Sequence, residues 1–224
     1  MYKSTIALAV VTLAPLGWQQ ELQQFPPYLQ LKDEQMILEY DANTDEVVVI
    51  VEGESEEALI QVEVRTPSGS PIIKLTSQET QGLALQSFMV ETLESSYAEV
   101  LQAFAEGIYD IRARTVDGEP MLGSVALSHA LPPAPVITYP VEGDTNVPTS
   151  NFTVSWVPDP EASGYRVSLE QNDNDGLTVE LPAGTGVFHV PDGILKPGTR
   201  TFVEVGAIGL NGNCTLVEVG FRTL

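Results

Sequence analysis

The sequence predicts an all-β protein made of two tandem antiparallel β-sandwiches, with one short helix in the first. From Met36 onward, apolar and polar residues alternate in short runs, which is the period of a strand that buries one face. Turn-forming residues separate these runs at roughly ten-residue spacing, as in sandwich folds. The proline-rich stretch LPPAP, residues 131–135, is typical of a domain boundary. We therefore expect one sandwich over residues 36–131 and a second over 132–224.

The first residues have the pattern of an export signal. Lys3 provides a short positive region, and Ile6–Leu16 an apolar stretch too short to span a bilayer. We interpret residues 1–17 as a signal peptide and 18–35 as a polar lead-in, with a first β-strand as the alternative. No other apolar run approaches the ~20 residues of a membrane helix, so no integral membrane segment is expected after signal removal. The chain is thus expected to be secreted, periplasmic or at the cell surface.

Alternation in the first half predicts seven strands with turn residues between them. The expected strands are QMILEY, EVVVIVE, LIQVEVRT, PIIKLT, LALQSFMVET, IYDIRART and MLGSVALSH, with turns at ANTD, GESEE, PSGS and SQETQG.

One segment of the first half, SSYAEVLQAFAEG, predicts a helix instead. Ser96 and Glu99 have the spacing of a capping box, in which each side chain binds the backbone N–H of the other residue. Gly107 is expected to cap the carboxyl end of the helix. The expected apolar face consists of Val100, Leu101 and Phe104.

The second half predicts seven further strands: PVITYP, NFTVSWV, GYRVSLE, LTVELP, GVFHVP, RTFVEVGAI and CTLVEVGFRT. Trp156 lies in the second of these runs and Tyr165 in the third. A Leu-x-Pro-Gly-Thr motif and a later Val-x-Ala…Gly pattern follow, formed by Leu195, Pro197, Gly198, Thr199, Val205, Ala207 and Gly212.

On these residues, the segment from about Pro133 to Leu224 resembles a fibronectin type III domain. The corner tyrosine of that family falls on Thr201, so the hydrogen bond of that tyrosine is absent or replaced. The resemblance implies a sandwich fold and a core position for Trp156. It implies no activity, since such sandwiches carry many functions.

The first half resembles Ig-like sandwiches more distantly. The stretch AEGIYDI, Ala105–Ile111, is similar to their x-Gly-x-Tyr corner and places Tyr109 at the start of a late strand. The expected pair of domains is similar to that of secreted bacterial proteins of unknown function.

Charge limits the classes of partner. The chain has 31 Asp and Glu against 10 Lys and Arg, a formal net charge of −21. A phosphate backbone needs a basic surface, so nucleic-acid binding is not expected. The acidity favours solubility, a salty habitat or the loading of divalent cations. Cys214 is the single cysteine and can form neither an internal disulfide nor a zinc site; we expect it to be buried in a strand.

A calcium loop is suggested by NDNDG, with Asp173 and Asp175 ahead of Gly176. With that glycine at position 6 of an EF-hand, position 12 falls on Pro182, where a bidentate glutamate is required. Asp175-Gly176 is instead predicted to form a tight hairpin turn. No metal site or cofactor is therefore expected. The weak calcium candidates that remain are Asp173, Asp175, the loop residues Glu52, Glu54, Glu56 and Glu57, and the pair Glu142 and Asp144.

No residues are expected to be catalytic. His129 and His189 are the only histidines, both near predicted strand ends, and no nucleophile elbow, phosphate loop or metal-protease motif accompanies them. We expect an exported non-enzymatic protein that acts in protein interaction or scaffolding, with an unknown protein partner and an open oligomeric state. The alternatives are a polysaccharide- or calcium-binding accessory module and, second, a hydrolase.

Overall fold

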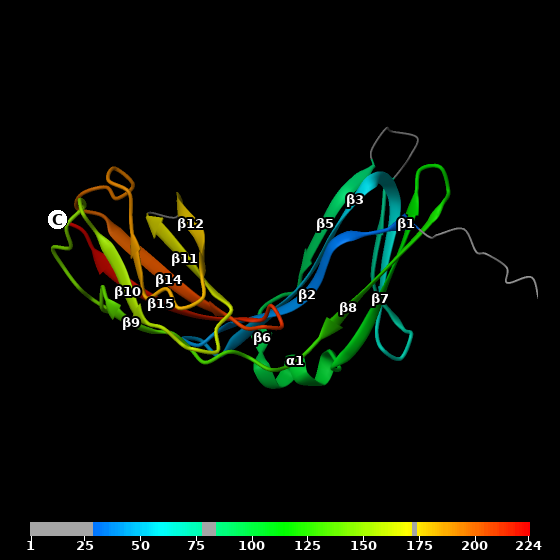
Figure 1. Cartoon of the computed structure of the whole chain (residues 1–224), viewed down its shortest axis with the longest axis horizontal. Helices are drawn as coiled ribbons and strands as arrows, with labels where there is room; N and C mark the ends of the chain where they lie inside the picture. Colours follow the sequence, from blue (N-terminus) through cyan, green and yellow to red (C-terminus); the bar gives the residue numbers. More distant parts are fainter. Residues whose placement is uncertain (1–28, 78–83, 172–173) are drawn as a thin grey trace, which may run out of the picture.

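The computed structural model describes residues 29–77, 84–171 and 174–224. The signal peptide, most of the lead-in, most of the SQETQG turn and Asp173 lie outside these residues. Within them the chain is all-β with one short helix, as expected, and it forms two lobes joined at a narrow waist (Figure 1). No helix in the described ranges is long and apolar enough to cross a membrane.

Each lobe surrounds its own hydrophobic core. The first lobe contains β1 (Leu29–Gln30), β2 (Lys32–Asp41), β3 (Glu46–Arg65), β4 (Pro71–Thr76), β5 (Leu85–Glu91), β6 (Ser95–Ser96), α1 (Tyr97–Ala103), β7 (Gly107–Thr115) and β8 (Pro120–Leu127). The second contains β9 (Val136–Tyr139), β10 (Thr153–Val157), β11 (Gly164–Gln171), β12 (Asn174–Pro182), β13 (Val187–His189), β14 (Arg200–Ile208) and β15 (Cys214–Arg222).

The strands do not separate cleanly into one set per lobe. Twelve belong to one mixed sheet in the order β1-β8-β7-β3-β2-β15-β14-β11-β12, with β4, β5 and β6 paired to β3; β13, β10 and β9 form a second sheet. The two lobes meet where β15 pairs with β2 in parallel, with Cys214 opposite Glu39 and Leu216 opposite Asp41. The division into two tandem sandwiches therefore stays a prediction.

The predicted turn GESEE is wrong. β3 continues through it, because β2 and β5 pair with the part before this stretch and β4 and β7 with the part after it. Ser55 is buried there; its hydroxyl accepts from Glu57 N at 3.0 Å and donates to the Met121 sulfur at 3.4 Å. The pairing register shifts between Glu54 and Leu59, so the strand bends there.

The helix has the predicted capping box but ends early. Ser96 accepts from Glu99 N, and the Glu99 carboxylate accepts from Ser96 N at 3.1 Å. Phe104, not Gly107, is the C-cap, because its backbone is extended (φ −121°) and its side chain packs against the first core. Gly107 begins β7 with φ 137°. Leu101, expected on the apolar face, is 37% exposed, and Val100 is the residue of this helix that is buried.

The expected hairpin between β11 and β12 is present, but its corner differs. Gln171 lies opposite Asn174, so Asp175 and Gly176 belong to β12 and not to a turn. Leu169 lies opposite Leu177, which already places the corner earlier in the chain than Asp175-Gly176, and the register slips between Leu169 and Gln171.

The second core contains the aromatic residues on which the family resemblance depends. Trp156 is 3% exposed, and its ring lies 5.3 Å from that of the buried Tyr165. Thr201, in place of the corner tyrosine, is fully buried and accepts a 2.7 Å hydrogen bond from Gln171. The core position of Trp156 is confirmed, and a threonine–glutamine bond occupies the place of the tyrosine corner.

The tyrosine corner expected in the first lobe is present. Tyr109 is fully buried, and its hydroxyl donates to Ala105 O at 2.9 Å, which ties the start of β7 to the segment before it. Tyr109→Phe removes this part-buried bond, so we expect the free energy of unfolding to fall by about 1 kcal/mol. Urea unfolding measures this. The control is Tyr40→Phe, whose exposed hydroxyl bond to Asp45 is 3.2 Å long; an equal loss in both variants would contradict the corner's role.

Candidate interaction face

One outward sheet surface gathers a large share of the chain's few cations. On β3 and β7 every second side chain points away from the first core, and strand register places these residues side by side. Glu63 lies between Lys74 and Arg112, and Arg65 lies opposite Asp110. We call this surface the arginine face; it consists of Arg65, Lys74, Arg112 and Arg114 together with Gln61, Glu63, Asp110, Pro120 and Leu122.

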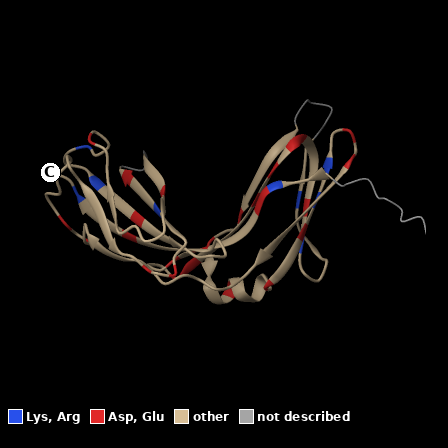
Figure 2. Cartoon of the chain, viewed as in Figure 1, with Lys and Arg blue, Asp and Glu red and all other residues tan. Residues whose placement is uncertain are grey.

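The arginine face is positive in a negative protein. It holds four of the chain's 10 Lys and Arg and two of its 31 Asp and Glu. Elsewhere the Asp and Glu residues are spread over both lobes and greatly outnumber Lys and Arg (Figure 2). The face is therefore a local exception to the overall charge.

The arginines differ in how far they are already paired. Arg65 is held by Glu63, with 2.5 Å between Nη2 and Oε1 and both side chains less than a third exposed. Arg112 and Asp110 are 3.9 Å apart and more than half exposed, a pairing worth about 0–1 kcal/mol. Arg114 donates one 3.3 Å bond to Gly118 O. Arg112 and Arg114 thus keep guanidinium donors directed to solvent.

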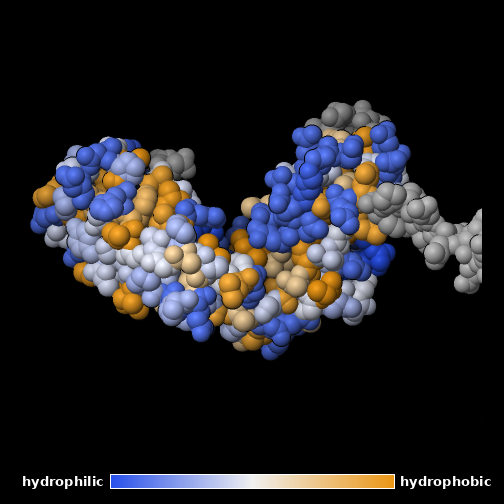
Figure 3. Space-filling view, viewed as in Figure 1, coloured by the Kyte–Doolittle hydropathy of each residue, from blue (hydrophilic) through white to orange (hydrophobic). Residues whose placement is uncertain are grey.

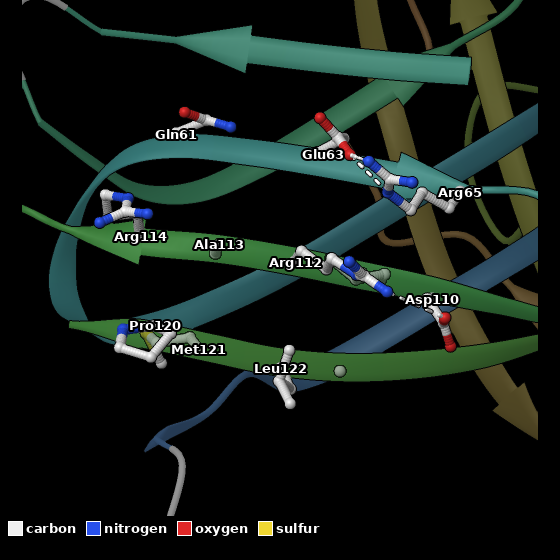
Figure 4. A pocket seen from close by; sticks show the side chains of 12 residues that line it. Gln61, Glu63, Arg65, Asp110, Arg112, Ala113, Arg114, Pro120, Met121 and Leu122 are labelled. Carbon is white, nitrogen blue, oxygen red and sulfur yellow. Dashed lines mark hydrogen bonds and ion pairs between the residues drawn. The ribbon is translucent and has the colours of Figure 1, made fainter. Parts of the chain in front are cut away.

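A hollow of about 560 Å³ lies over this face, lined from β3, β7 and β8 (Figure 4). In that view the Arg112 and Arg114 side chains extend over β7, with Leu122 and Pro120 beyond them on β8. The lining residues include no aromatic ring, so the face lacks the platform on which a neutral sugar would stack. Guanidinium groups instead match carboxylates through paired hydrogen bonds.

The opposite outward surface of the first lobe is acidic. We call it the carboxylate face; it consists of the outward residues Glu39, Asp41, Glu46, Glu52, Glu54, Met89 and Glu91 of β2, β3 and β5. A hollow of about 250 Å³ lies along it at Glu52 and Glu54. A second one, of about 180 Å³, lies at the waist end of the face, where Glu46 and Glu91 line it together with Glu204 and Leu216 of the second lobe. In Figure 3 the flank of the first lobe that faces the second is covered mainly by hydrophilic residues.

The calcium candidates do not converge. Glu52 accepts from Gln35, and Glu56 pairs with Lys32, both in the first lobe. Glu54 and Glu57 are exposed there as well. Nothing is described for Asp173 or for the side chain of Asp175. Among the described residues, no group of three or more Asp, Glu, His or Cys is arranged to hold a metal ion.

Glu142 and Asp144 lie in the second lobe, where they serve the backbone. Glu142 accepts from Gly220 N at 2.6 Å, and Asp144 accepts from Val141 N at 3.0 Å. They line a separate hollow of about 220 Å³ that also contains Arg200 and Arg222. The carboxylates of this loop therefore already have donors.

We expect calcium to leave the thermal midpoint unchanged, because the candidate carboxylates lie in separate lobes and several are already paired. The measurement compares unfolding in EDTA with unfolding in millimolar calcium, with sodium chloride added to equal ionic strength. A ligand that binds only the folded state raises the midpoint with its occupancy. A calcium-specific rise of several degrees would contradict the expectation.

The waist between the lobes has an unusual electrostatic environment. Arg166 of β11 contacts Glu39 of β2 at 2.5 Å, with both side chains largely buried. Nearby, burial raises the pKa of Glu204 to about 7; the neighbouring Arg166 opposes this, and Glu39, Glu218 and Asp41 add to it. Burial also raises the pKa of the Cys214 thiol to about 12, so Cys214 stays a protonated core residue, as expected.

Both histidines have structural surroundings. The His129 ring nitrogen Nε2 lies 2.7 Å from Phe104 O, which joins the segment after β8 to the end of α1. His189 is exposed at the end of β13, opposite Thr153. These positions near strand ends match the expectation.

The arginine face was not predicted from the sequence. A partial signal exists, because Arg112 and Arg114 alternate in IYDIRART and must share one side of a strand. Arg65 lies next to Arg112 and Arg114 only because β7 pairs with β3. This pairing joins residues about fifty positions apart, and the alternation does not encode it.

No family model matches the chain, and no curated protein matches it. Among solved structures, it is similar to fibronectin(III)-like modules of Clostridium thermocellum CbhA, with a TM-score of 0.35, 10% identity and coverage of 86% of this chain and 92% of that one. It is also similar to a two-domain fibronectin type III segment of chicken tenascin, with a TM-score of 0.31, 15% identity and coverage of 86% and 99%. A tetra-tandem repeat from the extending region of a large adhesion protein is similar as well, with a TM-score of 0.32, 11% identity and coverage of 85% of this chain and 49% of that one.

Proposed function

We propose that this chain is an exported, non-enzymatic protein of two tandem β-sandwiches, Ig-like and then fibronectin type III-like. It acts in protein interaction or scaffolding in the periplasm or at the cell surface, and the arginine face is its contact surface. The observation that carries the proposal is the gathering of Arg65, Lys74, Arg112 and Arg114 on one open sheet surface of a chain whose net charge is −21.

Burial and pairing support a binding role for this face over a purely structural one. Cations that only stabilise a fold are held by close partners, as Arg65 is by Glu63. Arg112 and Arg114 have one long contact each and extend over the hollow. Arginine is also among the residues enriched at protein interfaces, where its planar group adds both contact area and directional hydrogen bonds.

The waist supports the scaffolding part of the proposal. The β2–β15 pairing carries the main sheet from one lobe into the other, and Ala42 N donates to Leu216 O at 3.0 Å at its end. Side chains add further links: Asn43 exchanges two hydrogen bonds with the backbone of Glu218, and Thr215 donates to Pro132 O. Two lobes joined in this way keep a fixed mutual orientation, as a scaffold requires.

Photo-crosslinking in the cells that export the chain tests the proposal. A benzophenone side chain is placed at Leu122, an exposed sheet position on the arginine face, and in a matched variant at Val157, an exposed sheet position of the second lobe. We expect adducts with a defined partner from Leu122 and few from Val157. Adducts from neither position, or equally from both, would show that the arginine face is not the contact surface.

A further inference from the structure

The first lobe is electrically polar across its thickness. Buried residues of β2 and the first part of β3, such as Leu38 and Val49, share one core with Val64 and Ile111 of β3 and β7. Since these side chains point toward each other, the outward residues of the two groups of strands point in opposite directions. The arginine face therefore lies on one side of the lobe and the carboxylate face on the other. In Figure 1, β2 and β5 lie on the side of the lobe nearer the second lobe, and β7 lies on the far side.

The carboxylate face offers acceptors that the described part of the chain does not use. In this part, Glu46 and Glu91 have no side-chain hydrogen bond or ion pair, and both line the same hollow. Met89, 65% exposed, adds an apolar element to this face. The arginine face offers a match for each of these. Arg112 and Arg114 have free guanidinium donors for the carboxylates, and the exposed Leu122 is an apolar match for Met89.

We propose that the arginine face docks onto the carboxylate face of a second copy of this chain. The inference rests on the proposed function, since it names the partner of the same surface. The argument is charge and chemical complementarity: each guanidinium fork fits a carboxylate, and Leu122 meets the apolar part of the opposite surface. Because the two faces are different surfaces on opposite sides, the contact is head to tail and repeats, so copies add beyond a dimer, into an open row or into a ring where the rotation between copies closes.

Net charge sets the conditions under which this contact forms. At about 0.01 M salt the screening length is about 30 Å, and two chains of charge −21 repel each other before their faces meet. At 0.15 M it is about 8 Å, so the distant charges are screened while facing groups still attract. At 1 M the facing groups are screened too. Association is therefore strongest at intermediate salt and weaker at both extremes.

Sedimentation velocity of the exported chain tests the proposal over a wide range of protein concentrations. At 0.15 M salt we expect the weight-average sedimentation coefficient to rise continuously with protein concentration, and this rise to diminish at 0.01 M and at 1 M. Arg112→Gln with Arg114→Gln is expected to weaken association about tenfold. Lys196→Gln with Arg222→Gln is the matched control, because it removes the same charge from exposed positions of the second lobe.

A second pair of substitutions tests the other surface and the polarity. Glu46→Gln with Glu91→Gln is also expected to weaken association about tenfold. An equimolar mixture of the two double variants keeps one intact face of each kind, so it should form dimers that do not grow further. Thermal unfolding midpoints equal to that of the wild type would confirm that the variants fold.

Several outcomes would overturn the inference. A chain that stays monomeric under all conditions rules out the second copy, and the proposed function then stands or falls on the crosslinks from Leu122. Association that neither double variant weakens rules out these two faces. Wild-type association that stops at a dimer rules out the head-to-tail arrangement, since a closed pair uses one surface twice.

Discussion

Replacing Asn213 with alanine is expected to lower the free energy of unfolding by about 2–3 kcal/mol, because it removes the partner of a buried backbone N–H and of a half-buried carbonyl. Asn213 directly precedes β15, and its side chain is 1% exposed. Its side chain accepts from Leu38 N at 2.9 Å and donates to Ser128 O and Ala130 O at 2.8 Å each. Alanine would leave the buried Leu38 N–H and the half-buried Ser128 carbonyl without these partners, with a desolvation cost that is largest at Leu38, while Ala130 O keeps its 2.8 Å bond from Asn211.

Urea unfolding of the two proteins measures this loss. Asn43→Ala is the control, because Asn43 also makes two backbone hydrogen bonds across the waist but does so at an exposed position. Water replaces lost bonds at an exposed site, so that variant should lose about 1 kcal/mol or less. Equal losses in the two variants would mean that burial at Asn213 is not the cause.

Local patterns in the sequence predicted part of the fold. Alternation placed the strands of both lobes well, because Val62, Val64, Val203 and Val205 obey a period that only burial imposes. The capping box at Ser96 was predicted because both of its partners lie within one turn of the chain. Features of this kind depend on residues near each other in sequence.

Features that depend on distant partners were missed. GESEE was predicted to be a turn, since Gly and Glu are poor strand formers. The continuous β3 exists because β2 and β5 pair with one part and β4 and β7 with the other. The pairing of β2 with β15 joins residues more than 170 positions apart and has no local signal. The arginine face was missed for the same reason, because it arises only once β7 lies beside β3.

Glu204→Gln is expected to remove a pH dependence of stability that is centred on the waist. Burial is the main cause that raises the pKa of Glu204 to about 7, and the cross-strand neighbour Glu218 and nearby Glu39 add to it while Arg166 opposes it. In the unfolded chain the pKa of this carboxyl has its ordinary value of 4.5. Between these two values the folded protein keeps a proton that the unfolded chain releases.

The sign of the effect follows from this difference. The stability contribution of the protonated carboxyl is fully present below pH 4.5 and is lost as the pH rises through about 7. Glutamine is neutral at every pH and resembles the protonated acid in shape. The variant should therefore match the wild type near pH 4 and exceed it above pH 7 by at most about 3.5 kcal/mol, since each unit of pKa corresponds to about 1.4 kcal/mol.

Urea unfolding at several pH values between 4 and 8 measures the difference between the two proteins. General repulsion among the many carboxylates also weakens the fold as pH rises, so the comparison needs a variant that removes one charge elsewhere. Glu119→Gln provides it, because Glu119 is exposed in the first lobe next to β8, away from the waist. If the two variants gain equally above pH 7, the gain at Glu204 comes from lowered net charge. A gain confined to Glu204→Gln would mean that the buried carboxylate at the waist sets the pH range in which the two lobes are held most firmly.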